Sequence, residues 1–227
     1  MDKKTALLVG ASGLVGNLCL EDLVASGLYT DIIVVTRKKL FPAHLGVTNI
    51  VSDFSDLDEI ATQLKADHVY CALGTTIAKA GSQIAFKKVD YEYPLKVATL
   101  SKQNGAQKFI LVSAIGADSN SSVFYSKVKG KLEDALEKLN FDSLVILQPS
   151  FLLGKRSEVR LGELIGKNIA SALSFIFVGG LNKYKGIEAS DVAKSMVVFA
   201  NKRNEKLIRA QYKDMIKAAD EFGKWQS

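Results

Sequence analysis

Hydrophobic positions along the chain form short, nearly continuous runs that alternate with longer segments in which apolar residues recur at helical spacing. The runs are rich in β-branched residues, which is typical of parallel strands covered on both faces. We predict strands over residues 6–9, 32–35, 49–51, 68–72, 109–113 and 144–147, and helices over residues 14–26, 56–65, 82–104 and 125–139. This order predicts an α/β fold, a doubly wound and mostly parallel sheet with helices on both faces.

The alternation of strands and helices loosens after Pro149. Residues 150–186 are rich in glycine and basic residues, so we expect loops and short helices there. A helix is predicted to start near Asp191 with Ser190 as its N-cap, and residues 204–225 are predicted to be helical and amphipathic. No clear boundary divides the chain. We therefore predict a single domain over residues 1–227, with a core over 1–149 and a small lid and C-terminal helices over 150–227.

Composition places the chain among globular proteins and narrows its environment. With 227 residues, 48% of them hydrophobic and 24% charged, it can bury roughly three quarters of its unfolded surface without a disulfide or a metal. Its two cysteines, Cys19 and Cys71, both lie in apolar segments. Together with the lack of a signal-peptide pattern, they predict reduced core thiols in a cytoplasmic protein.

The net charge of +6 raises the question of a nucleic-acid partner. The lysines are scattered rather than clustered, and no stripe of basic and aromatic residues is present, so we expect none. The longest apolar stretches, near residues 143–154 and 169–180, fall short of the ~20 residues that a membrane-spanning helix needs, so we expect no membrane partner. A few positive charges are enough for a cleft that binds an anionic cofactor.

The first predicted strand runs into a glycine turn that a helix follows. Gly10 permits the tight turn, Gly13 lets the backbone approach a pyrophosphate, and Gly16 lets the helix pack closely on the sheet. The free amides and the positive dipole end at the helix start favour phosphate groups. A turn without a ligand is the alternative, but the flanking strand and helix favour a dinucleotide-binding Rossmann core over residues 1–149. The predicted cofactor contacts here are Gly10, Ser12, Gly13, Leu14, Val15 and Gly16.

The end of the second predicted strand bears on the choice of cofactor. NAD-preferring folds carry an acidic residue there, about 20 residues after the glycines, to bind the ribose 2′-hydroxyl. This chain has Thr36-Arg37-Lys38 instead. The two cations can meet a 2′-phosphate, Arg37 with two parallel hydrogen bonds, so we predict NADP(H) as the preferred cofactor and NAD(H) as the second option; an exposed basic turn is the alternative. Asp53 is placed either to accept a hydrogen bond from the adenine amino group or to cap the following helix.

Three side chains form a candidate catalytic group. Tyr125 and Lys129 are four residues apart on a predicted helix, so they share one face. Ser113 closes the preceding strand, 12 positions before Tyr125. A tyrosine with a pKa of ~10 is a poor proton shuttle, but a nearby ammonium lowers that pKa by stabilising the phenolate. We predict that Tyr125 donates a proton to a developing alkoxide, Lys129 assists it and holds the nicotinamide ribose, and Ser113 hydrogen-bonds the substrate carbonyl oxygen.

These residues give the chain a resemblance to a known family. The glycine turn, Ser113, Tyr125 and Lys129 resemble the short-chain dehydrogenase/reductase superfamily, which implies the same catalytic roles. Further runs resemble its atypical branch typified by the HIV Tat-interacting protein oxidoreductase, and the similarity covers roughly residues 5–200. Those runs are Cys71-Ala72-Leu73-Gly74-Thr75-Thr76, Lys79-Ala80-Gly81-Ser82, Val89-Asp90, Gly116-Ala117-Asp118 and Lys127-Val128-Lys129-Gly130.

The resemblance implies further cofactor contacts. In that branch the loop after the 68–72 strand borders the cofactor, and the segment after the 144–147 strand approaches the nicotinamide. The implied contacts are Leu73, Gly74, Thr75, Pro149, Phe151 and Leu152. Many superfamily members have an asparagine where this chain has Asp90, so the pattern of a four-residue proton relay is not matched. The sequence also offers no counterpart of the long C-terminal substrate domain of sugar-nucleotide epimerases, which argues against a nucleotide-sugar substrate.

Other polar and apolar residues are weighed against structural roles. His44 and His68 lack metal-like spacing, so both are interpreted as structural and no metal site is predicted. The mixed charges of residues 131–138 predict a solvent-facing side of a helix. The remaining candidates stay open: Arg156 and Arg160 as contacts of an anionic substrate or cofactor phosphate or as lid surface, and residues 173–178 as a substrate wall or a dimer contact.

Taken together, the motifs predict an NADP(H)-dependent oxidoreductase that acts on a small carbonyl compound by Tyr/Lys-assisted hydride transfer. The alternative is a non-catalytic NADP(H)-binding sensor that acts through a protein partner. The presence of both Tyr125 and Lys129 favours the enzyme. We expect a small-molecule substrate as its partner, and a monomer or homodimer as its assembly.

Overall fold

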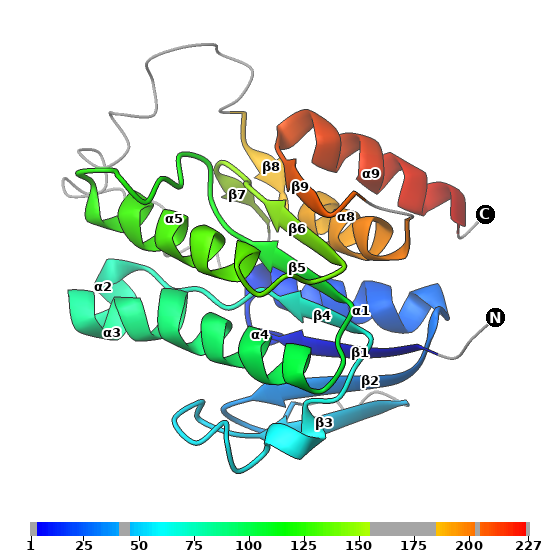
Figure 1. Ribbon diagram of the computed structural model, residues 1–227. Helices are drawn as coiled ribbons and strands as arrows, with labels where there is room; N and C mark the ends of the chain where they lie inside the picture. Colours follow the sequence, from blue (N-terminus) through cyan, green and yellow to red (C-terminus); the bar gives the residue numbers. More distant parts are fainter. Residues whose placement is uncertain (1–3, 41–45, 155–184, 203–204, 226–227) are drawn as a thin grey trace.

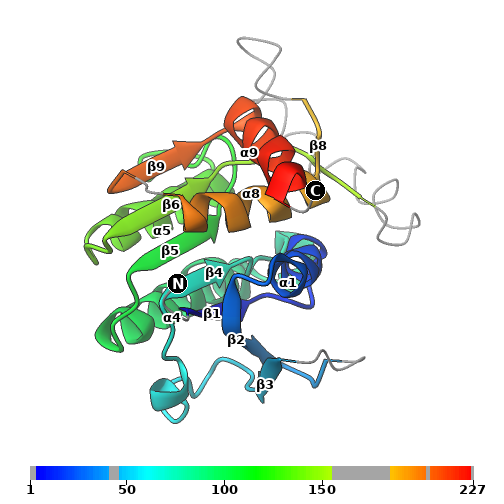
Figure 2. The ribbon, with the colours of Figure 1, turned by 90° about the vertical axis from the view of Figure 1, so that its right-hand side faces the viewer.

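One parallel sheet lies between two layers of helices in the computed structural model, which describes residues 4–40, 46–154, 185–202 and 205–225 (Figures 1 and 2). The strands run in the order β3-β2-β1-β4-β5-β6-β9, and every neighbouring pair is parallel. This confirms the predicted doubly wound fold. The strands are β1 (Lys4–Val9), β2 (Tyr29–Thr36), β3 (Val47–Val51), β4 (His68–Cys71), β5 (Lys108–Val112), β6 (Ser143–Leu147) and β9 (Leu207–Ala210).

The helices divide between the two faces of the sheet. Figure 2 shows α4 and α5 on one side and α1, α8 and α9 on the other, with α9 packed against α8. The helices are α1 (Leu14–Ser26), α2 (Ile77–Ala80), α3 (Gln83–Lys87), α4 (Tyr93–Gln103), α5 (Phe124–Glu137), α8 (Ala189–Asn201) and α9 (Tyr212–Trp225). A separate parallel pair is formed by β7 (Leu152–Leu153) and β8 (Ile187–Glu188). Among the described residues, no helix combines the length and the apolar character that crossing a membrane requires.

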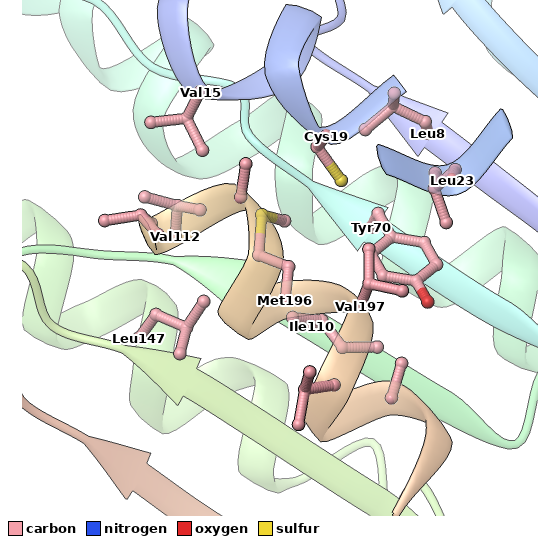
Figure 3. Packing of buried hydrophobic residues seen from close by; sticks show 14 of the residues in the cluster. Leu8, Val15, Cys19, Leu23, Tyr70, Ile110, Val112, Leu147, Met196 and Val197 are labelled. Carbon is pink, nitrogen blue, oxygen red and sulfur yellow. The ribbon is translucent and has the colours of Figure 1, made fainter. Parts of the chain in front are cut away.

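Alternate residues of each strand point to opposite faces of the sheet, and both faces are apolar because both are covered. In β1, Ala6 and Leu8 face the core under α1 and α8, whereas Leu7 and Val9 face the core under α4 and α5. Figure 3 shows the first of these cores, where Leu8 and neighbouring strand residues meet side chains of α1 and α8 such as Met196. Truncating one such side chain to alanine costs about 2–5 kcal/mol.

The helix predicted over residues 82–104 is divided by a wide turn. Ser82 caps its start by accepting a hydrogen bond from the Ala85 amide, and the π-helical turn η2 (Lys88–Glu92) separates α3 from α4. Pro94 follows this turn, and a proline cannot donate to the carbonyl four residues earlier and clashes with it. The wider winding removes that clash, and it carries Asp90 into the interior, where it is 1% exposed.

The helix predicted over residues 56–65 is absent. The chain makes turns there with one short 3₁₀ helix, η1 (Ala61–Gln63), although Leu57 and Leu64 are buried as a helical pattern would require. The reason lies at the start of the segment. Phe54 has a left-handed φ of +73°, and the amide and hydroxyl of Ser55 both donate to Asp53, so the side chain competes with a helical backbone pattern.

The C-terminal part contains a strand that the sequence pattern did not predict. Residues 207–210, expected to be helical, form β9 at the edge of the sheet, and α9 begins only at Tyr212. A strand of four residues with partly exposed positions is too short for its hydrophobic pattern to be recognised in the sequence. Ser190 does not cap α8, because the helix begins at Ala189 directly after β8, with Glu188 in the N-cap position and no side-chain cap. His44, Arg156, Arg160 and residues 173–178 lie outside the described residues.

Candidate active site

The turn between β1 and α1 leaves no room for a side chain at Gly10 or Gly16 and little room for one at Gly13. Gly10 has a left-handed φ of +91°, and a Cβ there would lie 2.5 Å from the backbone carbonyl of Ala72. A Cβ on Gly16 would lie 2.1 Å from the Gly10 carbonyl oxygen, and one on Gly13 would lie 3.1 Å from it. The start of α1 therefore packs directly on backbone atoms, with no side chains between them. The free amides and the positive end of the helix dipole there form a site that fits the phosphates of a dinucleotide.

The other residues predicted in this turn face different surroundings. Ser12 is exposed, Leu14 is partly buried, and the Val15 side chain lies in the core (Figure 3). Only the backbone of Val15 is therefore available to a cofactor. A cavity of about 470 Å³ lies beside the start of α1. Its lining residues are Gly13, Leu14, Asn17, Leu18, Gly154, Glu188, Ala189 and Ser190.

Arg37 and Lys38 follow β2 and are exposed. The turn that carries them is held in place, because the Thr36 hydroxyl donates to the Lys38 carbonyl at 2.7 Å and Asn49 donates to Thr36 at 2.8 Å. Asp53 lies after β3, where hydrogen bonds from the side chain and amide of Ser55 lower the pKa of its carboxyl. Since no helix follows directly, this carboxylate caps a turn rather than a helix.

Lys129 is buried at the carboxyl edge of the sheet beside a carboxylate. Its Nζ lies 2.8 Å from Asp90 Oδ1, with the two side chains 6% and 1% exposed. Asp90 Oδ2 also accepts a hydrogen bond from the Thr75 amide at 2.9 Å. A Cβ on Gly74 would lie 3.8 Å from Lys129 Nζ, so the Leu73–Thr75 loop borders this ion pair. Burial would lower the pKa of Lys129, but attraction by Asp90 and Tyr125 gives a net rise, so the lysine is charged.

Tyr125 begins the same face of α5, and its ring packs against Phe86 with centroids 5.6 Å apart. Burial raises the pKa of the phenol, Lys129 lowers it, and Asp90 raises it again; the net direction is upward. This corrects the expectation that Lys129 lowers the pKa of Tyr125 below its ordinary value. The physical reason is that Asp90 compensates the ammonium charge, so little of its field is left to offset the burial of the phenol.

Ser113 lies at the end of β5, but its hydroxyl has a protein partner. It donates to Glu133 Oε1 at 2.5 Å, and Glu133 lies on α5, one turn after Lys129. Gln148 Nε2 donates to both carboxylate oxygens of Glu133, at 3.2 and 3.0 Å. The Ser113 proton in this arrangement therefore points toward α5.

The segment after β6 lies beside the glycine turn. The Pro149 carbonyl accepts a hydrogen bond from the Ile115 amide at 2.9 Å, and the Phe151 carbonyl accepts one from the Ile187 amide at 2.8 Å. Leu152 continues into β7. A Cβ on Gly154 would lie 3.2 Å from the Leu14 side chain, so this segment and the start of α1 meet at the cavity.

Two carboxylates at this site carry roles that their sequence context did not reveal. Glu133 belongs to the stretch predicted to be a solvent-facing side, yet it is 3% exposed. The overlooked signal is its spacing, because it follows Tyr125 and Lys129 at intervals of four on one helix face. Asp90 is buried by the π-helical turn, which no local pattern predicts. In the described part of the chain, no group of three or more metal-ligating side chains comes together.

Comparisons with known proteins agree with this geometry. A family model described as NAD(P)H-binding matches residues 10–203. Protein HTATIP2 of Rattus norvegicus is 37% identical over 184 residues, covering 79% of this chain and 76% of the relative. The mitochondrial protein FMP52 of Candida albicans is 37% identical over 227 residues, covering 95% of this chain and 98% of the relative.

Solved structures show the same fold at low sequence identity. MoeE5 in complex with UDP-glucose and NAD has a TM-score of 0.69 and 15% identity, and covers 96% of this chain and 82% of its own. The UDP-N-acetylglucosamine 4-epimerase of Methanobrevibacter ruminantium has a TM-score of 0.68 and 18% identity, and covers 93% and 77%. These likenesses speak for the fold alone. The predicted cytoplasmic location is wrong by comparison with the fungal relatives, whose names describe them as mitochondrial.

Proposed function

Because the chain belongs to the NAD(P)H-binding family, and within it to the atypical short-chain dehydrogenase/reductases similar to HTATIP2, we propose that it is an NADP(H)-dependent oxidoreductase of a small carbonyl compound. One observation carries the proposal. A charged lysine, Lys129, is held beside Asp90 at the carboxyl edge of the sheet, with Tyr125 one turn earlier on the same helix. Ligands of open α/β sheets bind at this edge.

The residues divide the chemistry between them. NADP(H), when bound, supplies or accepts the hydride at the substrate carbon. As the carbonyl is reduced, its oxygen gains negative charge and takes the proton of the Tyr125 hydroxyl, while the Lys129 ammonium stabilises the phenolate that remains. In the reverse direction the phenolate takes the proton of the alcohol. In this proposal the same ammonium also holds the nicotinamide ribose.

The protonation state of Tyr125 supports reduction. Burial is the largest of the effects that leave the pKa of this phenol above its ordinary value. At neutral pH the side chain is therefore protonated, and its resting form is a proton donor. A base for alcohol oxidation would instead require the phenolate.

The basic turn after β2 supports NADP(H) over NAD(H). Arg37 and Lys38 are exposed at the position where an NAD-preferring fold carries an acid. Replacing Arg37 with alanine is expected to weaken NADPH binding by about tenfold or more, which is the scale of one charge-assisted hydrogen-bonded contact, and to leave NADH binding nearly unchanged. Equal losses for the two cofactors would refute the NADP assignment.

A substrate screen tests catalysis. Small aldehydes, ketones and quinones are offered with NADPH to the wild type and to Tyr125→Phe, and the binding of NADPH to each protein is measured separately. Loss of turnover with unchanged cofactor affinity is the expected result. If the variant turns over as fast as the wild type, Tyr125 is not the proton donor.

One observation favours the sensor as a second candidate. The Ser113 hydroxyl donates to Glu133, so in this arrangement it does not offer its proton to a substrate oxygen. A wild type that binds NADPH tightly but reduces none of the carbonyl compounds would support a sensor.

The location of the chain is a separate proposal. The mitochondrial names of its fungal relatives lead us to place it in mitochondria. Fractionation of cells that express the tagged chain tests this, with recovery in the organelle expected.

A further inference from the structure

Glu133 is a buried carboxylate for which the proposed chemistry has no use. It lies four residues after Lys129 and eight after Tyr125, so the three side chains share one face of α5. Only 3% of the residue is exposed. A buried ionised carboxylate is costly unless it is paired and hydrogen-bonded. Its partners therefore indicate what it does.

The partners of Glu133 come from the carboxyl ends of two strands and from the edge strand. Ser113 at the end of β5 donates at 2.5 Å, and Gln148 at the end of β6 donates to both oxygens. On β9, Arg209 Nε lies 3.6 Å from Oε2. The Arg209 guanidinium also pairs with Glu137 of α5, so its charge is shared between two carboxylates. The closest donor to Glu133 is thus the Ser113 hydroxyl.

A serine hydroxyl has one proton and two lone pairs. When the proton is donated to Glu133, Ser113 can present only lone pairs to the cleft. A substrate carbonyl oxygen also carries lone pairs, so the two oxygens have no hydrogen to share. Ser113 can assist reduction only when its proton turns away from Glu133.

We propose that Glu133 is a positioning residue that sets the direction of the Ser113 hydroxyl proton and thereby decides whether Ser113 donates to the substrate oxygen. The inference rests on the proposed reductase function. When Glu133 takes up a proton from solvent, its carboxyl O–H donates to Ser113 Oγ, and the serine proton turns to the substrate. When Glu133 is ionised, the serine proton returns to the carboxylate. No other bond forms or breaks.

The surroundings of Glu133 give this exchange a pH dependence. Burial raises the pKa of its carboxyl, while hydrogen bonds from Ser113 and Gln148 and the charge of Arg209 lower it; the net direction is upward. The charged groups around it are Arg209 from β9 and, one turn later on α5, Glu137. The protonated fraction grows as pH falls, so carbonyl reduction gains rate as pH falls through this pKa. This pH dependence is separate from the one that Tyr125 causes, because the phenol titrates at higher pH.

The decisive comparison is the pH profile of kcat for carbonyl reduction in the wild type and in Glu133→Gln. The glutamine amide N–H donates permanently to Ser113, and its carbonyl still accepts from Gln148, so the variant imitates the protonated acid. In the wild type, kcat should fall above the pKa of Glu133, by about tenfold per pH unit at most, until it reaches the level of Ser113→Ala. In Glu133→Gln it should stay flat over that range and exceed that of the wild type at pH values above this pKa. Asp134→Asn, an exposed neighbour on α5, is the matched control and should follow the wild type.

Ser113→Ala shows whether the effect passes through the serine. In that background, adding Glu133→Gln should no longer change the pH profile. A merely structural Glu133 would lower stability in both backgrounds and leave the shape of the profile unchanged. Thermal unfolding of each variant establishes that it is folded.

A measurement without turnover separates this inference from the proposed function. The infrared carboxyl band of Glu133 is titrated in the wild type and in Ser113→Ala, and the serine-free protein should titrate at higher pH because a hydrogen bond that lowers the pKa is gone. An active wild type whose pH profile matches that of Glu133→Gln would overturn the inference while the reductase stands. A band that titrates identically with and without Ser113 would overturn it even if no carbonyl substrate is turned over.

Discussion

Gly130 offers a sharp test of the packing around the site. It lies directly after Lys129 on α5, and a Cβ there would lie 2.2 Å from the Ser119 amide nitrogen and 2.3 Å from the Asp118 carbonyl carbon. Both obstacles are backbone atoms, which cannot turn aside as a flexible side chain can. The loop before α5 therefore rests directly on the helix at this point.

Two effects of opposite sign decide the outcome of Gly130→Ala. Alanine favours a helix interior over glycine by about 1 kcal/mol. Overpacking a well-filled site costs about 1–3 kcal/mol, occasionally more, and backbone contacts this short call for the upper end or beyond. The expected result is a net loss of about 2 kcal/mol. In a domain of this size that lowers Tm by about 4–8 °C.

Gly223 provides a matched control, because it is also helical, on α9, and a Cβ there would meet nothing within 4 Å. Gly223→Ala should therefore raise Tm by about 2–4 °C. Thermal unfolding of the two variants, monitored by circular dichroism, gives the comparison. If Gly130→Ala is stabilised as much as Gly223→Ala, the close approach of the loop to α5 is refuted.

Three further variants test separate features. Asp90→Asn leaves Lys129 buried without a counterion and should lower the free energy of unfolding by about 3–5 kcal/mol. Because Asp90 raises the pKa of Tyr125, the loss of reductase activity at alkaline pH should also move to lower pH in this variant. An unchanged alkaline pH profile would contradict this reasoning. Burial lowers the pKa of His68 to about 3 from 6.5, so the unfolded chain binds the extra proton and stability falls as pH drops below 6.5; His68→Gln should show a shallower fall of Tm. Gly10→Ala should weaken both folding and NADPH binding, whereas a normal affinity would argue against the glycine turn as the phosphate site.

The strands from β1 to β6 were predictable because each contains a short, nearly continuous apolar run, whereas β9, at the edge of the sheet, does not. The last four residues of β1 and the last three of β4 are apolar, since both faces of these strands are covered, and the spacing of the glycines after β1 is visible in the sequence. The helix predicted over residues 56–65 was wrong for the opposite reason. Its apolar spacing is helical, but the left-handed Phe54 and the Ser55–Asp53 hydrogen bonds are local features that outweigh the spacing.

The sequence displays the spacing of the candidate side chains but not the charged groups that surround them. Tyr125 and Lys129 share one face of α5, and Ser113, directly after β5, donates a hydrogen bond to Glu133 of the same helix; their catalytic roles stay predictions. The carboxylates that surround them depend on long-range placement. Asp90 reaches Lys129 from another helix, and Glu133 receives its partners from three strands, so neither environment is visible in a local window of sequence.

The π-helical turn has a consequence for how the chain tolerates change. Along the sequence it is equivalent to one residue inserted into an otherwise regular helix. Removing Tyr91 would take out this extra residue, bring back the clash at Pro94 and rotate the part of the helix before the deletion by about 100° relative to α4. The carboxylate of Asp90 would then leave Lys129 although neither residue had been substituted. The Asp90–Lys129 ion pair thus depends on the rotation of the Asp90 turn about its helix axis, and not only on the identity of the two residues.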